Sequence, residues 1–207
     1  MFNPVRRLTA ASLLTIFMPV SCWLVVAWLD RLPLWIPYIS DLALIEPATR
    51  MFQIGMVVIA LLYLSLLPHV HNLVPYRAAT GLYIASAIGM IVVGSYDWIS
   101  YPWVHYIAAI FAFGGFSAWT AIATFRVRPS GWRIGLIIVT GGLCIALVTL
   151  SVSYAAMPVS ADAMAWTERP WSMTIAASIE WLLLLSLALV GLSFRKDLSE
   201  IQASIIE

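Results

Sequence analysis

Charged residues are scarce in this chain of 207 residues. Aspartate, glutamate, lysine and arginine together make up 10% of it, whereas soluble domains carry about 25%. An ordinary soluble fold is therefore excluded. The formal net charge is only +1, and a nucleic-acid-binding protein needs a strongly basic surface, so we expect no nucleic acid among the partners.

Cysteine and histidine are also few, with two and three residues. Cys22 and Cys144 both fall inside apolar stretches, so no disulfide framework is implied. The chain has no Asn-x-Ser/Thr motif and hence no acceptor site for N-glycosylation. His69 and His71 form a lone His-x-His pair, which is only half of a metal site, so we expect neither a metal nor another cofactor.

Apolar residues are abundant instead, at 62% of the chain. A helix of about 20 apolar residues crosses the roughly 30 Å hydrocarbon core of a bilayer. The sequence therefore predicts an all-α, polytopic integral membrane protein with a single six-helix domain over residues 1–207. The expected spans are residues 8–29, 50–67, 78–96, 103–125, 134–154 and 172–194.

Proline marks the connections between these spans. Pro33, Pro37 and Pro47 prevent a long helix in residues 30–49, and the aromatic residues there predict a loop on the membrane surface. We expect residues 68–77 to form a short turn. The polar tail, residues 195–207, is expected to form one or two helical turns at the surface.

Basic residues are distributed unevenly between the two ends of the predicted bundle. With six spans both termini lie on one side, which carries eight basic residues against three on the other. The positive-inside rule then predicts that both termini are cytoplasmic. The eight are Arg6, Arg7, Arg77, Arg126, Arg128, Arg133, Arg195 and Lys196, and we interpret Arg126, Arg128 and Arg133 as determinants of topology.

Glu180 is the one charged residue in the last predicted span, residues 172–194. It lies about 12 Å along the helix from the start of that span. A carboxylate inside a bilayer costs about 2.5–3.5 kcal/mol on insertion scales, so Glu180 must face protein, a water-filled pocket or a partner. It is therefore either a functional residue or a buried polar tie between helices.

Other polar residues converge on the same, extracytoplasmic half of the predicted bundle. The remaining half is almost purely apolar, so we expect a cavity that opens to the outer leaflet and is sized for a lipid headgroup. The candidate lipid-binding residues are Ser40, Asp41, Arg50, Asp97, His105, Ser151, Tyr154 and Glu180.

Three chemical interpretations of this cluster remain open. His105 with Asp41 or Glu180 as catalytic residues could provide a general base for acyl or phosphoryl transfer. The cluster could instead bind a polar headgroup, with Arg50 available for a phosphate. In the third interpretation the residues form only a structural network, in which His105 satisfies Glu180.

Several short motifs resemble one membrane protein family. Pro37-Tyr38-Ile39-Ser40-Asp41, followed by Glu46-Pro47, is similar to the PYISD signature in the first outer loop of the Frag/DRAM/Sfk family. That family includes the damage-regulated autophagy modulators and the post-GPI-attachment factor of GPI-lipid remodelling. The other matching pieces are His105 with Phe113-Gly114 and Trp119, Glu180-Trp181, and Phe194-Arg195-Lys196-Asp197-Leu198.

The resemblance implies a six-helix membrane protein tied to lipid remodelling, lipid asymmetry or autophagy, with Asp41, His105 and Glu180 at family positions. We therefore expect a protein that binds, presents or remodels a lipid or glycolipid in the extracytoplasmic leaflet. One alternative is a lipid acyltransferase or hydrolase that uses His105 with a carboxylate. Another is a non-catalytic partner or regulator of other membrane proteins, with the tail or the small-residue strip Gly81, Ala85 and Gly89 as its interface.

Overall fold

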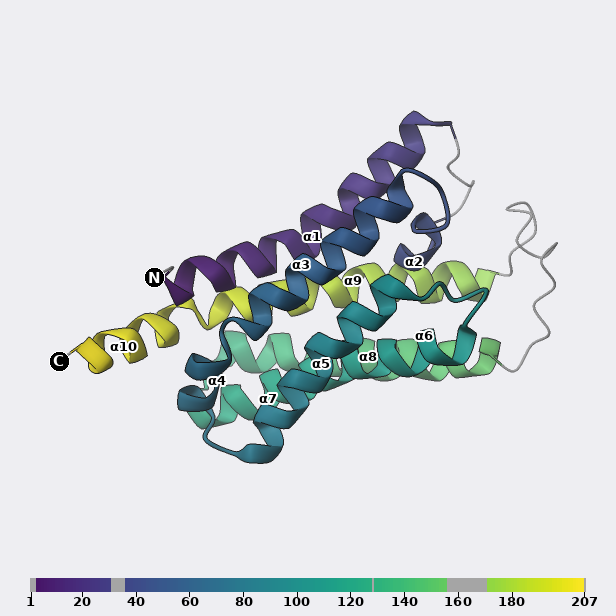
Figure 1. Ribbon diagram of the computed structural model, residues 1–207. Coiled ribbons are helices and arrows are strands. Elements are labelled where there is room, and N and C mark those ends of the chain that lie inside the picture. Colours follow the sequence, from purple (N-terminus) through teal and green to yellow (C-terminus); the bar gives the residue numbers. More distant parts are fainter. Residues whose placement is uncertain (1–2, 31–35, 128, 156–170, 207) are drawn as a thin grey trace.

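The computed structural model describes residues 3–30, 36–127, 129–155 and 171–206, without the side chains of 152–155, 171–172 and 204–206. Within these ranges every regular element is a helix, which confirms the predicted all-α class (Figure 1). The elements are α1 (Pro4–Trp28), α2 (Ile39–Leu42), α3 (Ala48–Leu64), α4 (Leu67–Leu73), α5 (Arg77–Ser95), α6 (Pro102–Ala109), the π-helix η1 (Ile110–Gly115), α7 (Phe116–Val127), α8 (Gly131–Ala155), α9 (Trp171–Ser193) and α10 (Arg195–Ile206).

Five helical segments of the described chain are long and apolar enough to cross a membrane, and a bent pair makes a sixth. The pair is α3 and α4, whose axes differ by 51°. The predicted turn at residues 68–77 is therefore wrong, because α4 occupies most of it. Pro68 is compatible with this helix because it lies in the first turn, where the missing N–H has no helical acceptor.

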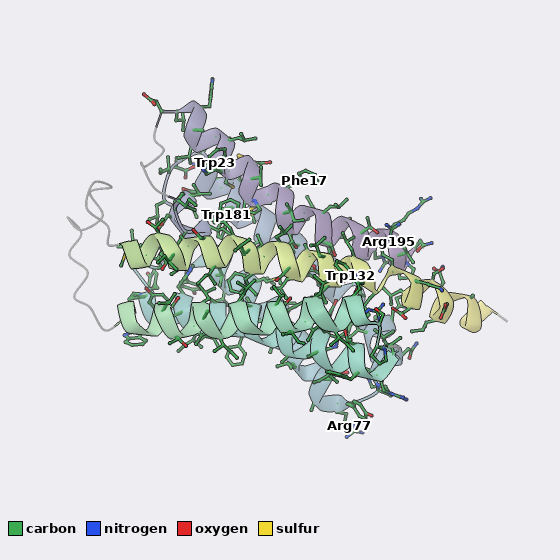
Figure 2. All side chains as sticks on the ribbon, turned by 180° about the vertical axis from the view of Figure 1, so that it is seen from behind. Phe17, Trp23, Arg77, Trp132, Trp181 and Arg195 are labelled. Carbon is green, nitrogen blue, oxygen red and sulfur yellow. The ribbon has the colours of Figure 1, made fainter. Side chains whose placement is uncertain are left out.

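Both termini lie at one end of the bundle, together with α4 and the start of α8 (Figure 1). Arg77, Trp132 and Arg195 gather at this end, which we call the terminal end (Figure 2). The opposite end carries α2, and we call it the α2 end. Trp28 and Trp103 are strongly exposed there, as expected for aromatic residues at a membrane–water interface.

The C-terminal tail is more ordered than the predicted one or two turns. Helix α10 has 12 residues, about three turns, and packs against α1 and α4. Asp197 and Leu198 on it are buried. The tail is therefore part of the folded bundle.

Arg133 anchors this tail. Its guanidinium donates from Nη2 to Asp197 Oδ2 and to the Ser193 carbonyl, both at 2.7 Å. It also lies 4.6 Å from the centre of the Phe194 ring, a distance that allows a cation–π interaction. Arg133 is thus a buried structural tie between α8 and the junction of α9 with α10, in addition to any effect on topology.

The fourth span is interrupted by η1, where α5 packs closely against it. A Cβ atom added to Gly89 would lie 2.7 Å from the Ala108 carbonyl and 2.8 Å from the Ala112 nitrogen. Gly89 therefore serves contact inside the bundle, as the predicted small-residue strip implies. Gly81, at the other end of that strip, has nothing within 4 Å of such a Cβ atom.

Candidate functional site

The short helix α2 dips into the bundle although it belongs to the loop after the first span. Ile39, Asp41 and Leu42 are almost fully buried, with exposed fractions of 5%, 0% and 0%. The Tyr38 N–H donates to Asp41 Oδ2 at 2.9 Å, so the carboxylate closes the first turn of the helix. We call residues 37–42 the α2 segment.

Two consecutive residues of α9 bind the backbone of the α2 segment. The Ile39 N–H donates to Glu180 Oε2 at 2.7 Å. The Trp181 indole N–H donates to the Pro37 carbonyl at 3.0 Å, and Trp181 projects from α9 toward α1 (Figure 2). These two hydrogen bonds satisfy backbone groups that would otherwise be buried without partners.

A narrow cavity lies beneath the α2 segment along the axis of the bundle. On α9 its lining runs from Glu180 to Leu187, and on α3 from Phe52 to Tyr63. These intervals correspond to about 10 Å and 16 Å of helical rise, close to half of a roughly 30 Å hydrocarbon core. The described lining residues are Thr15, Met18, Ile39, Ser40, Phe52, Met56, Ile59, Tyr63, Met90, Val93, Ala112, Phe113, Phe116, Glu180, Leu184 and Leu187.

The space inside this cavity is small. Its volume is ≈ 40 Å³ when counted as the space open to the centre of a water molecule, and one water needs about 10–15 Å³ on that measure. The walls are mainly aliphatic and aromatic, and apolar cavities stay dry or take apolar ligands. The cavity is therefore suited to a slender hydrocarbon group.

Two polar residues, Glu180 and Ser40, line the cavity at the α2 end. Glu180 uses Oε2 for Ile39, and within the described part of the chain its second oxygen has no hydrogen bond. The Ser40 hydroxyl likewise has no hydrogen-bond partner among those residues. The cavity thus combines an apolar body with one acceptor and one hydroxyl at its end.

His105 is buried near this site but does not belong to the described lining. Its Nδ1 lies 2.7 Å from the Tyr96 carbonyl, and a carbonyl only accepts, so Nδ1 carries the proton and Nε2 is the acceptor of the neutral ring. Asp41 interacts electrostatically with both His105 and Glu180. Asp41 and Glu180 meet at the α2 segment, which Glu180 binds through Ile39. His105 bonds to a backbone carbonyl where the sequence suggests Glu180.

Asp97 shapes the turn that leads to α6 and His105. Its Oδ1 accepts hydrogen bonds from the Ile99 and Ser100 N–H groups at 3.0 and 2.7 Å. Partial burial acts to raise the pKa of Asp97, but these hydrogen bonds outweigh it and hold the pKa below its ordinary value. Asp97 therefore acts on the site through the conformation of the loop.

The remaining predicted residues lie elsewhere. The Arg50 side chain is 79% exposed and pairs with Glu46 at 3.5 Å on the surface. Ser151 is half-buried on α8 and is not among the described lining residues. The side chain of Tyr154 lies outside the described residues.

Sequence reasoning missed the role of Trp181 and the apolar walls of the cavity. The sequence did contain a clue to the role of Trp181, because an indole N–H inside a span needs an acceptor. Met18, Met56 and Met90 carry no comparable signal, since apolar residues occupy most positions of every span.

Comparison with known proteins adds one match. The family model described as the Frag1/DRAM/Sfk1/Cwh43P N-terminal domain matches residues 8–201. This range includes the α2 segment, His105, Glu180 and Trp181. Comparisons with curated proteins and with solved structures found no match.

Proposed function

The chain belongs to the Frag1/DRAM/Sfk1/Cwh43P family, and from this premise we propose that it is a membrane protein that binds one hydrocarbon chain of an amphipathic lipid in its central cavity. One observation carries the proposal. Glu180 and Ser40 line the α2 end of a cavity with otherwise mainly apolar walls.

The dimensions of the cavity support a chain from a single leaflet. Its extent along α3 is about half of the hydrocarbon core. A lipid chain that enters with its polar end at Glu180 points toward the middle of the membrane, as it does in a bilayer. The polar end meets an acceptor at Glu180 and a hydroxyl at Ser40, which both donates and accepts.

The walls can adapt to an occupant larger than the present space. Met18, Met56 and Met90 come from three different helices, and methionine fills irregular gaps through its flexible, polarizable side chain. Met18 packs against Gly55, and Met56 packs against Gly94. Rotation of these side chains would change the width of the cavity.

The distribution of charge supports the extracytoplasmic leaflet as the source of the lipid. Arg6, Arg77, Arg126, Arg195 and Lys196 are exposed on helices and helix ends of the terminal end. By the positive-inside rule this end faces the cytoplasm, so the α2 end with Glu180 faces the other side. The protein then binds or presents a lipid of that leaflet.

The described contacts favour binding over the alternative of catalysis. A general base must reach the proton that it abstracts, but His105 does not line the cavity among the described residues. Its Nδ1 is also engaged with Tyr96. The acyltransferase or hydrolase alternative would need a second pocket beside Nε2.

Photo-crosslinking tests the proposed function. The purified protein is reconstituted in nanodiscs with a phospholipid that carries a diazirine on its acyl chain, and the labelled peptides are mapped after irradiation. We expect adducts on cavity-lining residues such as Ile59 and Leu184 as well as on the lipid-facing Val58 and Ile138. Adducts confined to the lipid-facing residues would overturn the proposal.

A further inference from the structure

The cavity also has hydroxyl groups at its far end, deep in the bundle. Thr15 and Tyr63 line the cavity there and come from α1 and α3. The hydroxyls of Thr15 and Ser12 lie beside that of Tyr63. Of this hydroxyl cluster, Thr15 and Tyr63 line the same cavity as Ser40 and Glu180, whereas Ser12 is not among the described lining residues. The Tyr63 hydroxyl lies near Gly191 of α9.

Gly191 on α9 leaves room for the cluster. A Cβ atom added there would lie 2.7 Å from Ser12 Oγ and 3.8 Å from the Tyr63 hydroxyl. The Ser12 hydroxyl is fully buried and has no hydrogen-bond partner in the described part of the chain. A buried hydroxyl without a partner is unfavourable in an apolar environment.

The aromatic packing of Tyr63 does not account for its hydroxyl. The Tyr63 ring contacts the rings of Tyr83 and Phe116, and those contacts need no hydroxyl. Tyr83 donates its own hydroxyl to the Tyr63 backbone carbonyl, so the side-chain hydroxyl of Tyr63 is not used in that tie. Thr15 donates to the Ala11 carbonyl at 2.8 Å and keeps its lone pairs for another donor.

We propose that the bound chain carries a second hydrogen-bonding group, which binds the hydroxyls of Thr15 and Tyr63 at the far end of the cavity. This inference rests on the proposed function, because it concerns the same cavity and the same occupant. We expect the second group about 10–16 Å from the polar end of the chain. The lower limit is the helical rise from Glu180 to Leu187, and the upper limit is the rise from Glu180 to Gly191. The ligand class is thus a long chain with one terminal and one internal oxygen or nitrogen function.

A pair of isomeric probes tests this inference. In 1,12-octadecanediol the second hydroxyl falls in that range when the chain is extended, whereas in 1,2-octadecanediol both hydroxyls are at one end. Binding of each diol to the full-length protein in detergent is measured by native mass spectrometry. We expect the wild type to prefer the 1,12 isomer by about three- to ten-fold, the effect of one net hydrogen bond.

Variants assign the preference to the cluster. Tyr63→Phe keeps the ring contacts, and Thr15→Val keeps the shape of the side chain, so each is expected to reduce the preference toward one. Thr140→Val is the matched control, because Thr140 also donates to the carbonyl four residues earlier but lies on α8 outside the described lining. It should leave the preference unchanged.

The outcomes separate this inference from the proposed function. Equal binding of the two diols to the wild type, or a preference that persists in both cavity variants, overturns the second polar site but leaves chain binding in place. Absence of binding by either diol and by 1-octadecanol contradicts the proposed function itself. A preference that is lost only in Tyr63→Phe and Thr15→Val supports both.

Discussion

The Glu180 carboxylate accepts the backbone N–H of Ile39 at 2.7 Å and so joins the last long span to the loop after the first. Trp181 repeats the connection one residue later, through the Pro37 carbonyl. Two short motifs that lie far apart in the sequence therefore form one unit. This unit covers the end of the cavity, since Ile39 and Ser40 are part of the lining.

The first prediction concerns this connection. Glu180→Gln keeps an oxygen that accepts the Ile39 N–H, whereas Glu180→Leu leaves that N–H buried without a partner. The test uses a protein that lacks Cys22 and Cys144 and carries Ser40→Cys, and it measures the rate at which a water-soluble maleimide labels this cysteine. We expect Glu180→Leu to raise this rate about five- to a hundred-fold, which is the effect of one unsatisfied buried group. Glu180→Gln should change the labelling rate little. Equal rates in both variants would mean that Glu180 does not hold the α2 segment.

The second prediction concerns the buried pair of Arg133 and Asp197. Removing one partner of a buried pair costs about 3–5 kcal/mol, whereas replacing both by apolar residues is often neutral. Arg133→Met or Asp197→Leu should therefore lower thermal stability in detergent strongly, and the double variant should recover most of it. Arg126→Met is the control, since Arg126 is exposed. Additive losses in the double variant would contradict the role of the pair as a tie.

The third prediction concerns pH and Asp97. Since the pKa of Asp97 is lower in the folded protein than its ordinary value of 3.8, its ionised form adds stability above that value. This contribution is lost as the pH falls through the folded pKa. Asp97→Ala should cost about 0.5–2 kcal/mol at pH 7, as for other carboxylates that cap a backbone turn. Wild type and Asp97→Ala are denatured at several pH values, and the difference between their free energies of unfolding should shrink below about pH 4. A difference in stability that does not change with pH would refute this prediction.

The fourth prediction concerns orientation in the membrane. Ser100 and Ser199 are both exposed, in the loop before α6 and on α10 respectively. In intact cells we expect a membrane-impermeant maleimide to label Ser100→Cys directly. Ser199→Cys should react only after permeabilisation, because the basic terminal end is cytoplasmic. The opposite pattern would place Glu180 and its cavity in the cytoplasmic leaflet.

The overall architecture and the burial of Glu180 could be predicted because both follow from hydrophobicity. Apolar stretches of sufficient length define the spans, and the high energy of a charge in hydrocarbon requires Glu180 to face protein. The partner of Glu180 could not be predicted in this way. It is a backbone N–H of Ile39, and backbone groups are the same at every residue except proline.

Helix α4 and the role of Arg133 were missed for related reasons. Pro68 suggests a break, but it is tolerated in the first turn of a helix, so only the structure decides between these readings. Arg133 looks like other basic residues beside a span until α10, which continues beyond α9, brings Asp197 to it (Figure 1). Both features depend on contacts between segments that are distant in the sequence.

Native mass spectrometry of the purified protein with its co-purified lipids tests the central account most directly. The comparison uses two neighbouring substitutions on α3: Ile59→Phe fills the cavity, and Val58→Phe changes only the exposed surface. We expect wild type and Val58→Phe to retain a defined lipid and Ile59→Phe to lose it. Retention of the same lipids by all three proteins would contradict chain binding in the cavity.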